Sequence, residues 1–256
     1  VYRQFIIYVP SIYKSSQPTP LIFNFHARNS NACKQMRYGD FRKISDTANF
    51  IILHPQGLKD NSGVTHWSLG HSKIDDIGFL ISLYSHIVSN YNINLDRVYS
   101  TGMSNGGYMS YYLACNMSDK IAAIASVTGA MGSFMQLNCR PIHPTPILEI
   151  HGTDDVIVPF NNIINGINYW RDYNNCNLIA DTTYIPNFNL EDLSTVEHIV
   201  YSNGNNNVST ELFKIINGEH TWPGAKRLKG VTNYDINASI EIWKFFSRYD
   251  INGLIN

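Results

Sequence analysis

The sequence has few charged residues and no excess of either sign. Only 15% of its 256 residues are Asp, Glu, Lys or Arg, and the formal net charge is −1. Nucleic acids and anionic membranes are normally recognised by basic patches, so we expect neither as a partner. No apolar run approaches the roughly 20 residues of a membrane-spanning helix, so we also expect no membrane insertion.

The signatures of metal, phosphate and repeat proteins are missing as well. The histidines show no metal-ligand spacing, and residues 152–155 are not a phosphate-binding loop because no lysine follows at the required place. No repeat, low-complexity tract or linker divides the chain, and 44% of the residues are hydrophobic, enough for a large core. We expect a single domain over residues 1–256 that needs no metal and no organic cofactor.

Cysteine is scarce, with four residues that allow at most two disulfides. Cys115 ends a predicted helix and Cys139 lies in the loop after the next predicted strand, so these two are the candidate pair. Cys33 and Cys176 have no partner that the residues indicate. A disulfide suits an oxidising compartment, and the start at Val1 instead of Met is typical of a mature or trimmed product. We therefore expect a secreted or periplasmic protein.

Short apolar strands alternate with helices along most of the chain. The apolar patterns predict strands over residues 2–9, 21–25, 50–54, 97–101, 121–127, 146–150, 195–201 and 212–216. They predict helices over residues 33–49, 75–88, 107–115, 161–173 and 235–247. Such alternation forms a mostly parallel sheet with helices on both faces. Residues 174–207 are irregular, and we expect a loop-rich excursion there instead of a separate lid domain.

One strand-to-helix turn carries a chemical motif. Residues 102–106, Gly-Met-Ser-Asn-Gly, fit the G-x-S-x-G nucleophile elbow, which needs a strand before it and a helix after it, as predicted here. Gly102 and Gly106 allow the sharp turn and the close approach of helix and strand. Ser104 would then stand at a helix N-terminus, where the dipole favours a developing oxyanion. Taken alone, the motif also fits an ordinary turn with an incidental serine.

Residues that could complete a catalytic site follow two other predicted strands. Asp154 and Asp155 come after the strand at 146–150, and His220 follows the last strand. Because active sites of parallel sheets gather at the carboxyl ends of strands, these residues and Ser104 should converge. A serine nucleophile needs a base, and the base needs a carboxylate to orient it. The chain order Ser, Asp, His is that of an α/β-hydrolase triad.

With these positions in place, the chain resembles a family of secreted α/β-hydrolase serine esterases. This family includes polyhydroxybutyrate depolymerases and the related feruloyl and acetylxylan esterases. The matching segments run in the same order over nearly the whole chain: residues 25–26, 54–57, 75–79, 102–107, 151–153 with 158–159, and 220–224. The resemblance implies an α/β-hydrolase fold with a mostly parallel central sheet, helices on both faces and no separate lid domain.

The resemblance also assigns roles by position. It makes Ser104 the nucleophile and His220 the general base. The acid is Asp155, two residues after the Thr of the His-Gly-Thr run, whereas Asp154 falls at a variable position that we interpret as solvated. The backbone N–H groups of Asn105 and Arg28 would form the oxyanion hole.

The loop that should supply the Arg28 donor departs from the family pattern. The family has His-Gly after the early strand, and here the segment reads His26-Ala27-Arg28-Asn29. Alanine tolerates a positive φ poorly, so a left-handed backbone at Ala27 would strain the oxyanion hole. We interpret His26 as structural.

A second departure concerns Cys176, which the family often pairs with a cysteine on the strand before the last. That strand has none here, so Cys176 is expected to be free. Two tryptophans stay open: Trp222 either lines the substrate cleft or packs under the His220 loop, and Trp67 poses the same choice.

For the substrate, the resemblance first implies a polyester such as polyhydroxybutyrate. Feruloyl or acetyl esters of plant cell walls are the alternative, so the partner is a polymeric or small-molecule ester. A non-catalytic binding member of the fold, favoured only by the altered residues 26–29, and a peptidase with the same triad are further readings. The sequence leaves the oligomeric state open.

Overall fold

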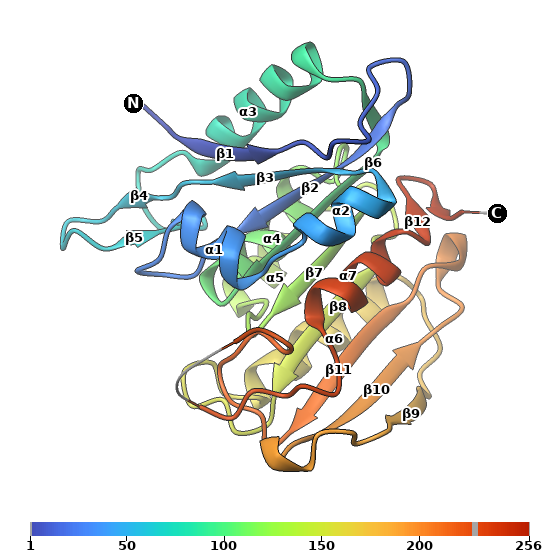
Figure 1. Cartoon of the computed structure of the whole chain (residues 1–256). Helices are drawn as coiled ribbons and strands as arrows, with labels where there is room; N and C mark the ends of the chain where they lie inside the picture. The colour runs from blue at the N-terminus through green and yellow to red at the C-terminus, as the bar shows by residue number, and fades with distance from the viewer. Residues whose placement is uncertain (1, 227–229, 256) are drawn as a thin grey trace.

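A nine-stranded, mostly parallel sheet runs through the computed structural model, which describes residues 2–226 and 230–255 (Figure 1). The strands lie in the order β1-β3-β2-β6-β7-β8-β11-β10-β9. Their bounds are β1 Phe5–Tyr8, β2 Thr19–Phe25, β3 Ile51–Pro55, β6 Ile93–Met103, β7 Ala123–Val127, β8 Ile147–Gly152, β9 Asp181–Ile185, β10 Thr195–Tyr201 and β11 Thr210–Ile216. Two short hairpins stand apart from this sheet, namely β4 Leu58–Lys59 with β5 Thr65–His66 and β12 Tyr249–Asp250 with β13 Gly253–Leu254.

The six central strands are parallel, and the strands outside them are antiparallel. β3, β2, β6, β7, β8 and β11 pair in parallel, whereas β1 pairs antiparallel with β3, and β10 pairs antiparallel with both β11 and β9. β2, β3, β7 and β8 are buried along their whole length, as expected of parallel strands that are covered on both faces. The carboxyl ends of the central strands therefore meet at one edge of the sheet.

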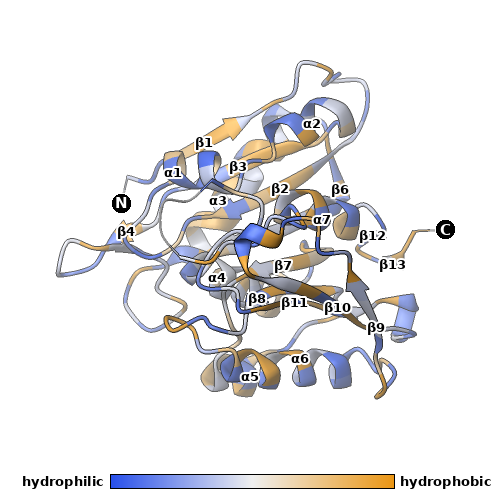
Figure 2. Cartoon of the chain, turned by 60° about the horizontal axis from the view of Figure 1, so that its bottom comes forward, coloured by the Kyte–Doolittle hydropathy of each residue, from blue (hydrophilic) through white to orange (hydrophobic). Residues whose placement is uncertain are grey.

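Helices cover both faces, which confirms the fold class expected from the sequence. The helices are α1 Ala32–Tyr38, α2 Arg42–Ala48, α3 Asp76–Asn90, α4 Asn105–Asn116, α5 Ser133–Asn138, α6 Asn161–Tyr173 and α7 Ala238–Phe246, with 3₁₀ turns at Leu190–Asp192 and Asn205–Asn207. α1, α2 and α7 lie on the face toward the viewer in Figure 1, and α3, α4, α5 and α6 lie behind it. Figure 2 shows the apolar strands enclosed between the two layers. No helix of the described chain has the length and apolar character to cross a bilayer.

The element predictions were wrong at three places. The single helix expected over residues 33–49 is divided into α1 and α2: Gly39 caps the end of α1, where its N–H donates to Gln35 O, and a Cβ there would lie 3.0 Å from the Trp222 indole. The short helix α5 was not predicted. Within the stretch 174–207, β10 matches the strand predicted over residues 195–201, but β9, which extends the sheet beyond it, was not predicted. β9 was missed because its sequence, Asp-Thr-Thr-Tyr-Ile, is mostly polar and lies at an exposed edge.

The helix after the G-x-S-x-G motif packs directly on the central strands. A Cβ at Gly106 would lie 2.2 Å from the carbonyl oxygen of Phe25 on β2, and one at Gly107 would lie 2.5 Å from Oγ of Ser126 on β7. Only glycine allows this approach. The two glycines thus place the N-terminus of α4 immediately over the carboxyl ends of β2 and β7.

The far end of α4 is held by a disulfide. Cys115, in the last turn of α4, is bonded to Cys139, which follows α5, and this is the candidate pair of the sequence. Cys33 and Cys176 are free thiols in the described structure.

Replacing Gly106 by alanine should destabilise the protein by about 1–3 kcal/mol, because the added methyl group collides with the backbone of β2. Gly132→Ala is the matched control, since a Cβ there meets no atom within 4 Å. We expect it to change the free energy of unfolding by about 0.5 kcal/mol or less in urea denaturation. Equal stabilities of the two variants would contradict the close packing of α4 on β2.

Removing the disulfide with the double change Cys115→Ala and Cys139→Ala should cost about 3 kcal/mol of stability. The bond closes a loop across 24 residues of sequence and restricts the unfolded chain. Cys33→Ala is the control, because this thiol is free and should contribute little. Urea unfolding measures the free energy of unfolding of each variant with and without reductant. Reductant should lower it in wild type and Cys33→Ala, which keep the disulfide, and leave the double variant unchanged.

Candidate active site

Ser104 lies at the junction of β6 and α4 with an unusual backbone. Its φ of 53° and ψ of −118° fall outside the regions that L-residues normally occupy, which is typical of a nucleophile elbow. The strained turn is fixed on both sides, because Ser104 N–H donates to Val127 O at 2.8 Å and Tyr108 N–H donates to Ser104 O at 3.0 Å. The first N–H groups of α4 have no carbonyl of their own helix to bind and point toward this junction.

Asp155 and His220 are brought together by the loops that follow β8 and β11. Thr153 N–H donates to Ile215 O at 2.8 Å, and Asp154 N–H donates to Gly218 O at 2.9 Å, so the two loops are joined along their length. Beyond these bonds, Nδ1 of His220 lies 2.7 Å from Oδ2 of Asp155. The carboxylate accepts the Nδ1 proton, which leaves Nε2 as the basic atom of the ring.

The Asp155 carboxylate is buried but well supplied with donors. Its Oδ1 accepts the N–H groups of Ile157 and Val158, each at 2.9 Å. Burial alone would raise the pKa of Asp155, but hydrogen bonds from His151 and His220 hold it well below its usual range. Asp155 is therefore ionised when the pair works. Asp154 is exposed and accepts only the Thr153 hydroxyl among its side-chain contacts in the described chain, in agreement with its interpretation as solvated.

A second imidazole lies behind Asp155. His151 on β8 is fully buried, with Nδ1 3.0 Å from Glu149 Oε1 and Nε2 2.8 Å from Val158 O and 3.3 Å from Asp155 Oδ2. Glu149 is also fully buried and accepts the Tyr111 hydroxyl at 3.0 Å. The sequence indicated structural support for His151 but missed Glu149. A glutamate within the apolar run Ile147–Gly152, two residues before a histidine and hence on the same strand face, was the available signal.

The loop of residues 26–29 forms a tight turn without strain at Ala27. Ser30 N–H donates to Ala27 O at 3.2 Å, and the positive φ of this turn, 58°, belongs to Asn29. Ala27 is not among the described residues with a positive φ, so the backbone strain expected at this position does not occur. The Arg28 side chain is directed outward to Asp60, 2.6 Å away, and only its backbone N–H belongs to the turn.

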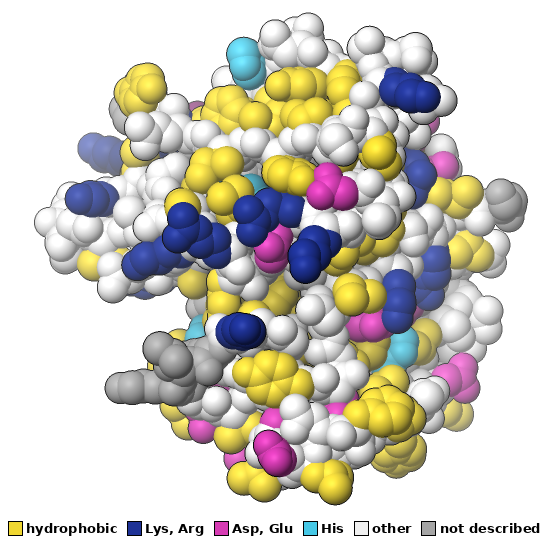
Figure 3. All heavy atoms as spheres, in the orientation of Figure 1, with side chains coloured by type: hydrophobic (Ala, Val, Ile, Leu, Met, Phe, Trp, Pro, Cys, Tyr) yellow, Lys and Arg dark blue, Asp and Glu magenta, His cyan; other side chains and the backbone are white. Residues whose placement is uncertain are grey.

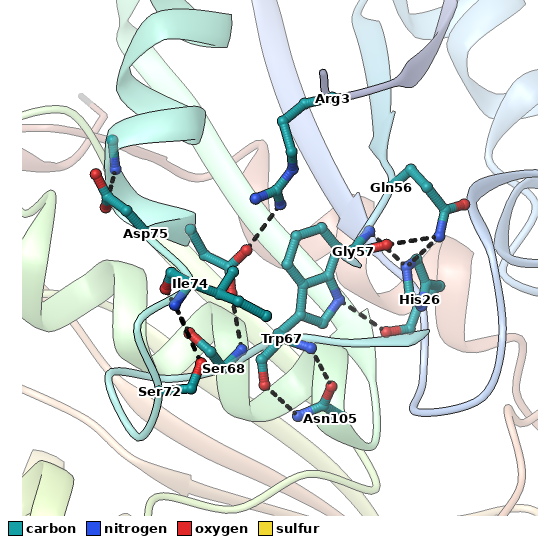
Figure 4. Close-up of polar contacts among 12 residues, drawn as sticks. Arg3, His26, Gln56, Gly57, Trp67, Ser68, Ser72, Ile74, Asp75 and Asn105 are labelled. Atoms are coloured by element: carbon teal, nitrogen blue, oxygen red, sulfur yellow. Dashed lines mark hydrogen bonds and ion pairs between the residues drawn. The ribbon is translucent and has the colours of Figure 1, made fainter. Parts of the chain in front are cut away.

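Trp67 links this loop to the elbow (Figure 4). Its backbone is held by the Asn105 side chain, which accepts Trp67 N–H at 2.7 Å and donates to Trp67 O at 3.2 Å. Its indole Nε1–H donates to His26 O at 3.0 Å. The ring is 1% exposed, so the prediction of substrate contact for Trp67 is wrong: the ring is enclosed between β2 and α4.

His26 is a structural residue. It is fully buried, its Nε2 accepts Gly57 N–H at 2.9 Å, and its Nδ1 lies 2.8 Å from Ala27 O. An acceptor role for Nε2 requires the proton on Nδ1, and burial lowers the pKa of the ring, so His26 is neutral. The neutral ring fixes the path of the chain into the turn at Arg28.

Trp222 packs beneath the loop that carries His220. It is 1% exposed, its Nε1–H donates to Ser239 Oγ at 3.1 Å, and its ring meets Phe41 edge-on. Of the two alternatives left by the sequence, this burial supports the packing role, and the ring also borders the cavity described next.

A cavity of about 510 Å³ opens above Trp222, between α1 and α2 on one side and the segment after His220 on the other. Arg37, Lys43 and Lys226 contribute to its lining, and Figure 3 shows Lys and Arg side chains gathered over α1 and α2. A smaller cavity of about 160 Å³ lies beside Tyr108, one turn after Ser104. Within the described residues, no group of His, Cys, Asp and Glu side chains could hold a metal ion.

Comparison with known sequences places this geometry among esterases. Residues 77–194 match the family model described as phospholipase/carboxylesterase, a segment that holds Ser104 and Asp155 and ends before His220. A bifunctional acetylxylan esterase/xylanase of Neocallimastix patriciarum is 27% identical over 72% of this chain and 26% of that protein. Feruloyl esterase B of Piromyces equi is 28% identical over 62% of this chain and 30% of that protein. The chain thus spans about a quarter to a third of the length of these two relatives.

One more relative and one solved structure also carry esterase names. A probable feruloyl esterase C of Aspergillus oryzae is 27% identical over 76% of this chain and 69% of its own length. The structure of an acetyl xylan esterase from Aspergillus awamori superposes with a TM-score of 0.72 over 95% of this chain and 93% of that chain, at 14% identity, which supports the fold. The chain therefore has an α/β-hydrolase fold, and its sequence is similar to those of feruloyl and acetylxylan esterases.

Proposed function

We propose that this protein is a serine esterase that removes acetyl or feruloyl groups from plant cell-wall polysaccharide. The observation that carries the proposal is the Asp155–His220 hydrogen bond, formed at the sheet edge where the strained Ser104 stands. The names of these relatives describe activity on acetylxylan and on feruloyl esters. They therefore favour this substrate class over the polyester, which was the first expectation from the sequence.

In the proposed mechanism Ser104 Oγ attacks the ester carbonyl while Nε2 of His220 takes its proton. Asp155 stabilises the resulting imidazolium through the Nδ1 hydrogen bond. The backbone N–H groups of Asn105 and Arg28 bind the oxyanion of the tetrahedral intermediate. Its collapse breaks the bond to the alcohol, which leaves with the proton from His220. Water, activated by His220 in turn, then releases the acid from Ser104.

The surface beside this site suits a polar polymer. The cavity between α1, α2 and the segment after His220 is lined by Arg37, Lys43 and Lys226 against one carboxylate, Asp40. This excess of positive charge would attract carboxylate substituents of a polysaccharide. A hydrophobic polyester has no charged groups along its chain that these side chains could bind. The disulfide supports an oxidising, extracellular setting, and the continuous sheet supports a single catalytic domain over residues 1–256.

A panel of esters tests the proposal. Methyl ferulate, acetylated xylan, polyhydroxybutyrate film and a matched amide are compared with wild type and Ser104→Ala. We expect turnover of methyl ferulate or acetylxylan, and fluorophosphonate labelling that Ser104→Ala abolishes. Preference for the polyester would restore the first interpretation of the sequence, and preference for the amide would indicate a peptidase. Failure of wild type to be labelled would indicate a non-catalytic scaffold, although the ordinary backbone at Ala27 removes the feature that favoured one.

Asp155→Asn should lower kcat by roughly 10⁴-fold, because an amide cannot hold His220 in the required tautomer. Asp154→Asn is the matched control, since the neighbouring carboxylate is exposed and does not contact His220. We expect it to keep activity within a few-fold of wild type. Steady-state hydrolysis of a short p-nitrophenyl ester measures both, and similar losses in the two variants would argue against Asp155 as the acid.

Arg28→Pro should reduce kcat by roughly 10²–10³-fold, because it removes one proposed oxyanion donor. The turn should survive, since proline is favoured at the second position of a turn whose third residue has a positive φ. Arg28→Ala keeps the N–H and loses only the outward contact with Asp60, so it should remain close to wild type. If Arg28→Pro is folded by circular dichroism and fully active, the second donor lies elsewhere.

A further inference from the structure

We propose that His151 and Glu149 form a buried ion pair that lowers the pH at which the Asp155–His220 pair becomes a working base. The inference rests on the proposed esterase function and adds two positioning residues to it. Neither side chain reaches the surface, so they act only through Asp155.

The contacts of His151 define which of its nitrogens carry protons. Nε2 lies 2.8 Å from Val158 O, which can only accept, so Nε2 must be protonated. Nδ1 faces Glu149 Oε1 at 3.0 Å, and the other oxygen of Glu149 accepts the Tyr111 hydroxyl. Burial raises the pKa of Glu149, and its hydrogen bonds to His151 and Tyr111 oppose that rise. In the proposed pair Glu149 is ionised and accepts on both oxygens, and His151 is an imidazolium.

The surroundings favour this charged form. Burial alone would lower the pKa of His151, but its hydrogen bonds to Asp155 and Glu149 and the charge of Glu149 raise the pKa to about 9. The titratable groups facing the pair from α4 are the phenols of Tyr108 and Tyr111, whose pKa values burial raises further above 10, so they stay neutral. From β8 and its loop the ring meets Glu149, Asp155 and the edge of Phe160.

The pair is oriented with its positive end toward the catalytic acid. His151 Nε2 lies 3.3 Å from Asp155 Oδ2, the same oxygen that binds His220 at 2.7 Å, whereas Glu149 lies on the far side of the ring. Asp155 is thus shared between two imidazoles. A carboxylate that is already partly neutralised stabilises the His220 imidazolium less, so the His151–Glu149 pair weakens the hold of Asp155 on the imidazolium form of His220.

The test is the pH dependence of kcat/KM in the double variant Glu149→Gln, His151→Gln. Both residues are changed together because removing one would leave the other charge buried and unpaired. Gln at 151 can still donate to Val158 O, so the loop is kept while the charge is lost. We expect the acid limb of the profile to move up by about half a pH unit or more.

The matched control is His198→Gln. His198 forms another histidine–carboxylate pair with Glu211 at 2.8 Å, at the opposite end of β11 from His220. Its profile should superimpose on that of wild type. A folded double variant whose acid limb does not move would reduce His151 and Glu149 to packing residues and overturn the proposal.

Two further readouts do not depend on activity. The ring ¹⁵N and ¹H resonances of His151, assigned by their loss in the double variant, should show protons on both nitrogens at pH 7. A bare Nδ1 would overturn the inference. Because these spectra need no turnover, they also separate a failure of the ion pair from a failure of the esterase proposal, which would appear as absent labelling of Ser104.

The second readout is stability against pH. The folded-state pKa of His151, about 9, exceeds the ordinary value of 6.5, so its stabilisation is complete below about pH 6.5 and is lost as the pH rises through 9. The gap in unfolding free energy between wild type and the double variant should therefore narrow from pH 6.5 to 9.5. A constant gap would contradict a buried imidazolium.

Discussion

The close contact between the carboxyl ends of β8 and β11 is the constraint on which the candidate site depends. A Cβ at Gly152 would lie 2.1 Å from Gly218 O, so only glycine lets the two strand ends approach this far. The hydrogen bond from Asp154 N–H to Gly218 O then continues the parallel pairing beyond the strands. Asp155 and His220 are 65 positions apart in sequence, yet this extension leaves their side chains within hydrogen-bonding distance. The proposed catalytic pair is thus a consequence of sheet geometry.

Burial of charge behind the site follows from the same packing. Ionised carboxylates buried without donors are costly, and Asp155 avoids this cost through two backbone N–H groups and two imidazoles. Each imidazole in turn needs a partner, which for His151 is Glu149. The chain of contacts ends at the neutral hydroxyl of Tyr111, on the buried face of α4. The single negative charge of Asp155 is therefore accompanied by a series of polar side chains, His151, Glu149 and Tyr111, that extends into the core.

The sequence predicted those parts that depend on strand order and missed those that depend on side-chain direction. Ser104, Asp155 and His220 could be located because each follows a strand of a parallel sheet, and parallel strands end together. The burial of Trp67 could not be foreseen, because a Gly-rich loop carries no periodicity that distinguishes a buried ring from an exposed one. Glu149 escaped notice because a single acid in an apolar strand has no motif. The division between α1 and α2 falls at Gly39, whose close packing on Trp222, nearly two hundred residues away, has no signal in the local sequence.

Residues 26–29, the proposed oxyanion loop, depart from the family pattern and still form a turn without a positive φ at Ala27. The left-handed backbone that glycine would accommodate falls on Asn29, a residue type that adopts it at low cost. Ala27 then needs no special freedom. The two proposed donors, at Arg28 and Asn105, come from different strand ends, but Trp67 binds the Asn105 side chain with its backbone and the carbonyl of His26 with its indole. Trp67 thus joins the two segments that carry the proposed donors, so the geometry of the proposed oxyanion hole depends on the packing of this buried residue as well as on the loop itself.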